Sequence, residues 1–312
     1  MRAVFAALVA ILLLALSGAA FGHSPTDLLA LLVGGSVGST FALQGTLLKS
    51  VPLLLTGLSV VLAFRAGVWN IGGEGQFIVG ALAALVASRY GAVASIAAAM
   101  IAGAAWASIA TLMRLWRNAP EVLTTILLNF TAIHLLGWCV NGPLREKAAM
   151  YPQSDLAEAA LPRFGGIALA VLACVAAWYL LYRTKEGLRL RATGANANAA
   201  EWAGINIRAQ LARAMAVSGA MSGLAGGIEL LGVTHRLFER FAAGYGYSGI
   251  AVALLAQLHP LATLASAFFF GALVTGAGEL QRTANISAAV ATFGQAAVIL
   301  TLIGFEHVRR RA

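Results

Sequence analysis

The hydrophobic positions of this chain form long runs separated by short polar segments. Runs of mostly apolar residues, each long enough or nearly long enough to cross a bilayer, occupy residues 3–21, 50–66, 75–90, 92–113, 122–140, 166–182, 211–232, 247–258, 261–278 and 287–305. A crossing helix needs about 20 such residues. The pattern therefore predicts an all-α polytopic transmembrane bundle of about ten spans, with the third and the eighth shorter than the others.

The segment between the first two runs is only weakly amphipathic. It opens with Ser24, Pro25, Thr26 and Asp27, residue types that commonly begin a helix, so we expect residues 22–48 to lie on the membrane surface. The run 3–21 has the charged start and small residues of a secretory signal. Its length and the spans that follow favour a retained first span, and sequencing the mature N-terminus distinguishes the two alternatives.

Composition supports lipid as the solvent of most side chains. Of the 312 residues, 60% are hydrophobic and 11% are charged, whereas a soluble domain carries about 25% charged residues. Thirty-four glycines suit the close helix packing of membrane bundles. Cys139 and Cys174 lie inside apolar runs and are interpreted as small hydrophobic residues, which leaves no disulfide framework or metal cluster.

The net charge of +9 would point to nucleic acid in a soluble protein, but in a membrane protein basic residues gather in cytoplasmic segments. We therefore expect no nucleic-acid partner. The distribution of Lys and Arg favours both termini inside, with residues 141–165 as the longest outer loop and residues 183–210 as the longest inner loop. No soluble domain is indicated, so residues 1–312 are predicted to form a single transmembrane domain.

The segment RAGVWNIGGEGQ, residues 65–76, interrupts the apolar pattern with four glycines and several polar side chains. Glycine disfavours continuous helix, and non-helical backbone at membrane depth is tolerated only inside protein or beside a water-filled cavity. Broken helices of this kind line solute sites in transporters. The candidates for a solute path are Trp69, Asn70, Gly72, Glu74 and Gln76. The alternative is an ordinary cytoplasmic turn, in which Glu74 caps the amides of the third span.

A second polar group lies at the start of the fifth span. Pro120 and Glu121 suit a first helical turn. Thr125 and Asn129 follow one and two turns later, and polar side chains in lipid normally face other helices. We add Thr125 and Asn129 to the candidate path.

The inner loop contains GANANAAEWAG, residues 194–204, which predicts a short helix of about two turns bounded by glycines. Its small residues and one tryptophan suit docking in a cleft of another protein; the alternative is a solvated connector. The candidate docking residues are Gly194, Asn196, Asn198, Ala199, Ala200, Trp202 and Gly204.

The sequence lacks a phosphate-binding G-x-x-x-x-G-K-[ST] loop, an H-E-x-x-H pair and a G-x-S-x-G elbow. No catalytic residue, metal site or bound cofactor is expected. The carboxylates are dispersed, which disfavours a membrane enzyme. Only Glu229 and His134 would suit an ion-driven secondary transporter, which needs ionisable groups deep in several spans.

Four segments resemble one family in the family's order: FRAGVWNIGGEGQFIVGALAA, EVLTTILLNF, GANANAAEWAGINI and GYGYSGIAVALLAQLHP. This set, extending from about residue 40 to the C-terminus, is similar to permeases of the branched-chain amino acid, simple sugar and nucleoside group of ABC importers, closest to the nucleoside type. Trp69 stands where phenylalanine is common, and Ala119 and Pro120 precede Glu121 where asparagine is frequent, which leaves the solute open.

The resemblance implies a type II ABC importer permease of the bacterial inner membrane. It implies a separate ATPase subunit that uses ATP, a second related permease in a heterodimer, and an extracytoplasmic solute-binding lipoprotein. Residues 194–204 would then be the coupling helix, and residues 70–76 would lie along the path. The expected cargo is a nucleoside; a simple sugar or another polar metabolite is the alternative.

Overall fold

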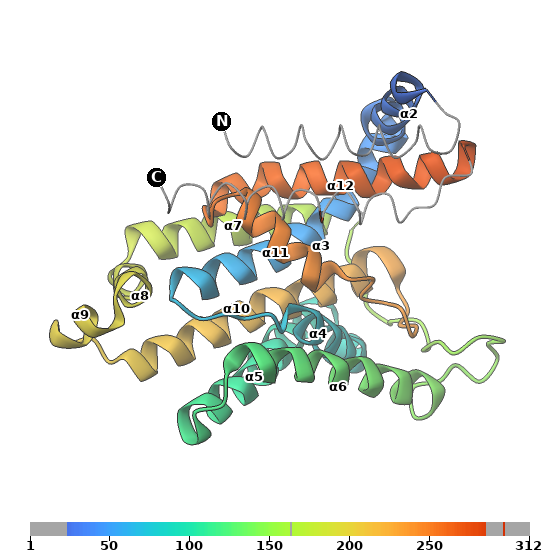
Figure 1. Ribbon diagram of the computed structural model, residues 1–312. Coiled ribbons are helices and arrows are strands. Elements are labelled where there is room, and N and C mark those ends of the chain that lie inside the picture. The colour runs from blue at the N-terminus through green and yellow to red at the C-terminus, as the bar shows by residue number, and fades with distance from the viewer. Residues whose placement is uncertain (1–23, 163, 285–295, 297–312) are drawn as a thin grey trace.

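The structure is a computed structural model that describes residues 24–162, 164–284 and 296. Within these ranges the chain is all-helical, with two isolated β-bridges and no strand (Figure 1). The helices are α2 Pro25–Val37, α3 Thr40–Arg65, α4 Gly73–Ala87, η1 Ser88–Tyr90, α5 Ala92–Arg117, α6 Glu121–Asn141, α7 Gly165–Arg183, α8 Lys185–Ala195, α9 Ala197–Trp202, α10 Ile207–Glu229, η2 Leu230–Thr234, α11 Tyr245–Leu255 and α12 Pro260–Thr283.

Every apolar run predicted between residues 50 and 278 becomes a helix, which confirms the all-α bundle. Among the described residues, six helices are long and apolar enough to cross a membrane: Thr40–Arg65, Ala92–Arg117, Glu121–Asn141, Gly165–Arg183, Ile207–Thr234 and Pro260–Thr283. The two runs predicted to be short are α4 and α11, with 15 and 11 residues. The runs 3–21 and 287–305, and with them both termini, lie outside the described residues.

Two expectations about the connecting segments were wrong in detail. Residues 40–49 do not belong to a separate surface segment, because α3 begins at Thr40, where Ser39 accepts a hydrogen bond from the N–H of Ala42 at 3.0 Å, and continues as one helix into the span. The inner loop is also more helical than predicted. Residues 185–195 form α8, so Gly194 lies inside a helix and does not bound the short helix α9.

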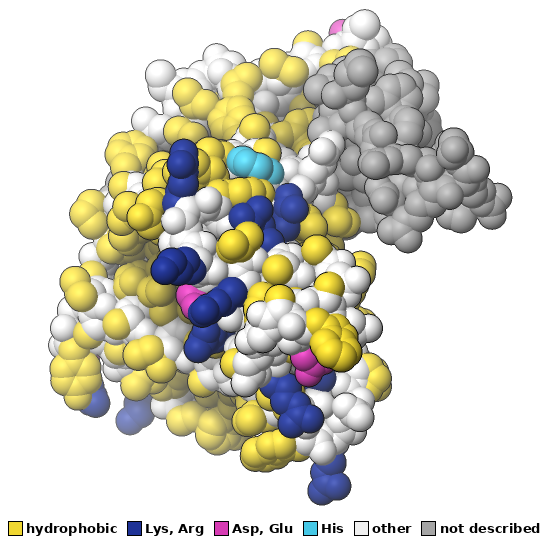
Figure 2. Space-filling model, turned by 90° about the vertical axis from the view of Figure 1, so that its left-hand side faces the viewer, with side chains coloured by type: hydrophobic (Ala, Val, Ile, Leu, Met, Phe, Trp, Pro, Cys, Tyr) yellow, Lys and Arg dark blue, Asp and Glu magenta, His cyan; other side chains and the backbone are white. Residues whose placement is uncertain are grey.

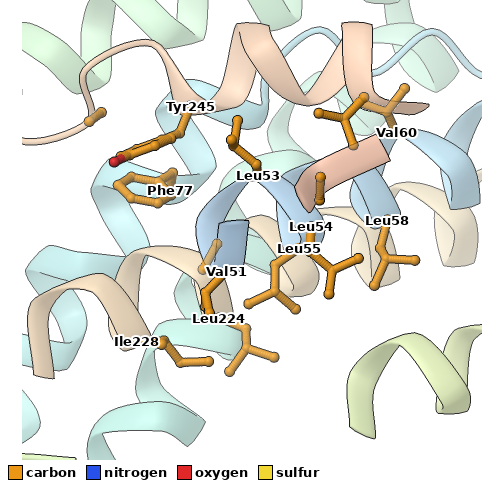
Figure 3. Packing of buried hydrophobic residues seen from close by; sticks show 14 of the residues in the cluster. Val51, Leu53, Leu54, Leu55, Leu58, Val60, Phe77, Leu224, Ile228 and Tyr245 are labelled. Atoms are coloured by element: carbon orange, nitrogen blue, oxygen red, sulfur yellow. The ribbon is translucent and has the colours of Figure 1, made fainter. Parts of the chain in front are cut away.

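Helix α3 is the centre of the bundle. Its most apolar stretch is mostly buried and packs against α7, α10, α11 and α12, in keeping with a helix that is hydrophobic all round. Figure 3 shows one part of this core, where Val51 lies among Phe77, Tyr245, Leu224 and Ile228. By contrast, α5, α6 and α7 expose much of their apolar surface, as expected of helices that face lipid or another membrane protein.

Helices α4, α5 and α10 approach each other through glycines. A Cβ on Gly103 of α5 would lie 2.3 Å from the carbonyl oxygen of Gly219, and a Cβ on Gly80 of α4 would lie 2.4 Å from the Cα of Gly223. Small residues allow such backbone contact between membrane helices, where van der Waals packing replaces the hydrophobic effect as the force of association. The three helices therefore form one closely packed group beside α3.

On the side that the sequence predicts to be outer, the loop 141–165 is joined to the segment between η2 and α11. The N–H of Ser154 donates to the carbonyl of Leu237 and the N–H of Leu237 donates to Ser154 Oγ, each at 2.9 Å. Arg236 forms an ion pair with Glu146. These two segments make one continuous layer over this end of the bundle.

Replacement of Gly223 by alanine should strongly destabilise the protein. Its Cβ would lie 2.2 Å from the carbonyl oxygen of Ala99, and overpacking of this kind costs about 1–3 kcal/mol. Thermal unfolding of the detergent-solubilised protein measures the change. The matched control is Gly137→Ala on α6, where a Cβ meets nothing within 4 Å; equal melting temperatures for the two variants would contradict the packing described here.

Candidate functional site

Two of the bundle's helices begin in its interior after non-helical segments. Residues 66–72 separate α3 from α4, and residues 235–244 separate the π-helical turn η2 from α11. With a rise of about 1.5 Å per residue, α4 and α11 are each shorter than an apolar layer of about 30 Å. Their first turns touch, since a Cβ on Gly73 would lie 3.4 Å from the Cα of Gly246.

Glu74 joins the two short helices. Its side chain is buried in the first turn of α4, and its carboxylate accepts hydrogen bonds from the N–H of Gly244 at 2.8 Å and of Gly246 at 2.7 Å. These amides open α11, so the carboxylate lies at the positive end of that helix dipole. The sequence predicted a cap for the third span, α4. The capped helix is instead α11, far away in the sequence.

Asn70, in the non-helical segment, and Gln76, in the first turn of α4, form a reciprocal pair of side-chain hydrogen bonds. Asn70 Nδ2 donates to Gln76 Oε1 at 3.0 Å, and Gln76 Nε2 donates to Asn70 Oδ1 at 2.9 Å. Asn70 Oδ1 also accepts from the N–H of Gly72 at 2.9 Å, while Nδ2 donates to Ser218 Oγ of α10 at 2.7 Å. Both side chains are buried. This network satisfies polar groups that lipid could not.

Asn129 fixes the same segment from α6. Its Oδ1 accepts from the N–H of Gly75 at 2.8 Å, and its Nδ2 donates to the carbonyl of Ile71 at 2.9 Å and to the hydroxyl of Tyr247 at 3.2 Å. A single amide thus bridges the end of the break, the start of α4 and the first turn of α11. The sequence placed Asn129 on a helix face but gave no sign of these partners.

Thr125 lies one turn before Asn129. Its hydroxyl donates to the carbonyl of Glu121 at 2.7 Å, and its Cβ would be 3.2 Å from a Cβ on Gly72. Thr125 therefore packs against the break without a polar contact to it.

Trp69 differs from the other candidate path residues. Its side chain is 56% exposed, and its ring centroid lies 4.7 Å from that of Phe64. Asn70, Glu74, Gln76, Thr125 and Asn129 are instead buried, with the hydrogen bonds given above. The structure brings the predicted path residues together around one break, and their part in solute movement stays a prediction.

The predicted docking residues lie at the opposite end of the bundle from the loop 141–165. Asn196 caps α9 by accepting from the N–H of Ala199 at 3.1 Å, and Gly204 follows with a φ of 80°. Asn198 is exposed, Ala200 is buried, and Trp202 is 92% exposed. Figure 2 shows this end of the molecule, where Lys and Arg side chains gather around α8 and α9.

Helix α8 connects this docking segment to the rest of the bundle. Glu186 accepts hydrogen bonds from Gln210 at 3.2 Å and from Arg213 at 2.8 Å, both on α10, and from Arg189 at 2.5 Å. The hydrogen bond from Gln210, together with the charged groups of Arg189 and Arg213, lowers the pKa of the Glu186 carboxyl. This attachment therefore holds at neutral pH and weakens only as the pH falls through that lowered value.

Gly194 carries a contact that the sequence did not reveal. A Cβ on Gly194 would lie 2.2 Å from the carbonyl oxygen of Arg65, so the backbone of α8 lies directly against the start of the break. The Arg65 guanidinium donates to the carbonyls of Leu258 at 2.9 Å and Gln257 at 3.4 Å, which form the turn after α11. Arg65 and Glu74 thus hold opposite ends of α11, each with the charge that suits that end of the helix.

Among residues 24–162 and 164–284, no group of three or more His, Cys, Asp or Glu residues is placed to hold a metal ion. Cys139 and Cys174 are free and buried. The buried polar groups at the break form hydrogen bonds with backbone amides and carbonyls and with one another.

Comparison with known proteins gives a consistent result. The profile of the family described as "Branched-chain amino acid transport system / permease component" matches residues 42–302. A glucose ABC transporter permease protein of Haloferax volcanii is 31% identical over 93% of this chain and 83% of its own length. A guanosine ABC transporter permease protein of Bacillus subtilis is 30% identical, covering 92% and 88%. A nucleoside ABC transporter permease protein of Lactococcus lactis is 29% identical, covering 88% and 84%.

Replacement of Glu74 by glutamine should destabilise the bundle, because the new NH2 group faces an N–H donor and leaves an amide of α11 unsatisfied. An unsatisfied buried donor costs about 1–3 kcal/mol. Thermal unfolding in detergent measures the loss. Glu158→Gln, on the exposed outer loop, is the control and should leave the melting temperature unchanged; a Glu74→Gln protein as stable as that control would refute the capping role.

Proposed function

The chain belongs to the family of branched-chain amino acid transport system permease components, and on that premise we propose that it is the membrane-spanning subunit of an ATP-driven importer whose cargo is a nucleoside. It is a multi-pass protein of the inner membrane. The observation that carries the proposal is the match of the family profile along residues 42–302, joined to a structure in which several long apolar helices surround two interior breaks.

Two features support a nucleoside as the cargo. Two of the relatives described above are named for guanosine or nucleosides. Trp69 also presents an exposed aromatic face beside the break, and stacking of a base on an aromatic ring contributes about 1–3 kcal/mol. The second candidate is a simple sugar, which the similarity to the glucose permease protein of Haloferax volcanii favours.

The remaining features of the importer are part of the same proposal. The chain forms a single domain over residues 1–312, with about ten spans, both termini in the cytosol, loop 141–165 outside and loop 183–210 inside. It binds no cofactor, and ATP is used by a separate ATPase subunit, so this chain is not itself catalytic. A second, related permease pairs with it, and the exposed apolar faces of α5, α6 and α7 support such a membrane-embedded partner.

The proposed partners act at opposite ends of the bundle. An extracytoplasmic solute-binding lipoprotein delivers the cargo to the outer layer in which loop 141–165 is tied to the segment before α11. The ATPase binds α9 in a cleft, for which the exposed Trp202 and the small residues beside it are suited. Closure of the ATPase then moves α9 together with α8.

The contact of α8 with the break gives that movement a route into the bundle. Gly194 lies against the backbone of Arg65, and Arg65 holds the turn that ends α11. A shift of α8 therefore displaces the start of the break and the end of α11 together. The break ends, and α11 begins, where α4 and α11 meet. Two arrangements of this unit would open the path to one side or the other, which is what alternating access requires.

An ion-driven secondary transporter is less well supported. Such a protein needs titratable groups free to exchange ions at membrane depth. Glu229 is instead paired with Lys49, at 4.0 Å between Oε1 and Nζ.

Uptake by the reconstituted complex tests the cargo. With this permease, its permease partner, ATPase and binding protein in proteoliposomes, unlabelled guanosine and other nucleosides should inhibit uptake of labelled guanosine, while glucose and pentoses should not. The Trp69→Ala variant should raise KM for guanosine, since it removes the stacking face. Inhibition by glucose or pentoses but not by nucleosides would contradict a nucleoside cargo and support sugar transport.

The coupling of ATP hydrolysis to transport should separate into two steps, binding of the ATPase and transmission of its movement. Trp202→Ala should weaken the binding of the ATPase, measured by co-purification, because it removes the exposed anchor of α9. Gly194→Ala should keep the ATPase bound but lower the number of solute molecules moved per ATP hydrolysed, because its Cβ pushes α8 away from Arg65. Gly278→Ala on α12, where a Cβ meets nothing within 4 Å, is the matched control.

Normal transport per ATP in the Gly194→Ala complex would show that the contact between α8 and Arg65 does not transmit the movement. Full ATPase binding by Trp202→Ala would separately refute the docking role of α9.

A further inference from the structure

Three polar side chains meet inside the bundle, and of these the sequence analysis singled out Glu229 alone. Lys49 comes from α3, Glu229 is the last residue of α10, and Tyr245 is the first residue of α11. Lys49 Nζ donates to the Tyr245 hydroxyl at 2.9 Å and lies 4.0 Å from Glu229 Oε1. We call these three residues the Lys49 cluster.

The members of the Lys49 cluster differ in exposure. The side chain of Glu229 is 4% exposed and that of Lys49 is 41% exposed. Tyr245 is buried, and its ring centroid lies 5.8 Å from that of Phe77. Figure 3 shows the two rings next to each other. The ammonium group is therefore anchored on two buried partners, while part of the lysine side chain remains open to its surroundings.

In the proposed orientation, the Lys49 cluster lies toward the outer end of the span formed by α3. Lys49 precedes Arg65 on the continuous helix α3 by about 24 Å at 1.5 Å per residue, and the apolar layer is about 30 Å thick. Tyr245 begins α11 at the point where α11 meets α4. Exposing a charged lysine to hydrocarbon is costly. The exposed part of the Lys49 side chain therefore suits contact with water or solute better than contact with lipid.

Stability alone does not explain the pair. Replacing a buried ion pair by apolar residues of similar volume is often neutral or stabilising, because two charges must be removed from water to form it. Glu74 and Asn129 satisfy backbone amides, so their burial has a structural reason. The carboxylate of Glu229 has Lys49 as its partner in the described structure. Its effect is to hold the ammonium in place and to cancel its charge.

Charge and donor count indicate what the open side of Lys49 binds. An ammonium group has three donors; one is used by Tyr245, another faces Glu229, and a third is left. The pair carries no net charge, so it offers a hydrogen-bond donor without a surplus of positive charge. This suits a neutral solute with hydroxyl, carbonyl or ring-nitrogen acceptors, and gives no advantage to an anion.

We propose that Lys49, held by Glu229 and Tyr245, contacts the solute in the membrane path and selects neutral, acceptor-bearing solutes. This site is distinct from Asn70, Gln76 and Asn129, whose side chains are already engaged within the protein. The inference rests on the proposed import function, and it assigns a solute contact to residues on α3, α10 and α11.

The decisive variant removes both charges at once. The double variant Lys49→Met, Glu229→Gln leaves no unpaired buried charge, so it should fold and bind the ATPase normally. If Lys49 contacts the solute, uptake by the double variant should still fall by about tenfold or more, the value of a hydrogen bond to a charged group. The matched control is Arg282→Gln, Glu279→Gln, which removes the ion pair on α12 at 2.5 Å and should transport normally.

Normal uptake by the Lys49→Met, Glu229→Gln complex would show that the pair is only structural and would overturn the inference. A second measurement does not depend on the cargo. In a background with Cys139→Ala and Cys174→Ala, Lys49→Cys should react with a membrane-impermeant charged thiol reagent. The cationic reagent should react faster than the anionic one, because Glu229 is then unpaired.

The rate of that reaction should also change when the ATPase is trapped in its ATP-bound state. Lack of reaction at Lys49→Cys, or the same rate in both states of the ATPase, would refute a place in the path. Failure of the unaltered complex to move any nucleoside or sugar would instead refute the proposed function. The labelling experiment then still decides whether Lys49 borders water.

Discussion

The structure depends on one requirement: backbone polar groups at membrane depth must find their partners inside the protein. Two helices begin in the interior, so their first amides cannot be hydrated from outside. Glu74 accepts hydrogen bonds from the first amides of α11, and Asn129 and Asn70 accept hydrogen bonds from amides at the start of α4. Glu74 and Asn129 lie on other helices than the ones they cap, whereas Asn70 lies in the break directly before α4. The caps therefore also decide how α4, α6, α10 and α11 are arranged.

This arrangement places a charged side chain from another segment at each end of α11. Glu74 holds its first turn and Arg65 holds the turn after its last residue, and both residues flank the same break. The two contacts suit the helix dipole and attach the break to both ends of α11. Because Gly194 lies against Arg65 with no side chain between them, α8 adjoins this unit directly. A rigid connection of this kind passes on small displacements that a flexible loop would absorb.

The sequence predicted the parts of the fold that depend on local pattern. Apolar run length located helices α3 to α7 and α10 to α12, and the glycines and polar residues of 65–76 located the break, because both signals lie within one segment. The partners of these residues could not be predicted. Nothing near Glu74 in the sequence indicates Gly244 and Gly246, and nothing near Gly194 indicates Arg65. Helix α8 was missed because its sequence is polar and short, so that no apolar run marks it.

The same reasoning separates scaffold from function among the polar residues of the bundle. Asn70, Gln76 and Asn129 use their side-chain amides in hydrogen bonds at the break. Removal of any one of these side chains therefore leaves a buried polar group without a partner. Lys49 serves no backbone group, and its charge is cancelled by a carboxylate that likewise has no backbone amide to cap. Stability alone does not explain a buried ion pair that satisfies no backbone group, and this is the ground for the proposed contact with the solute. In this bundle the conspicuous glycine-rich motif builds the frame, and the proposed solute contact lies on the less conspicuous lysine of α3.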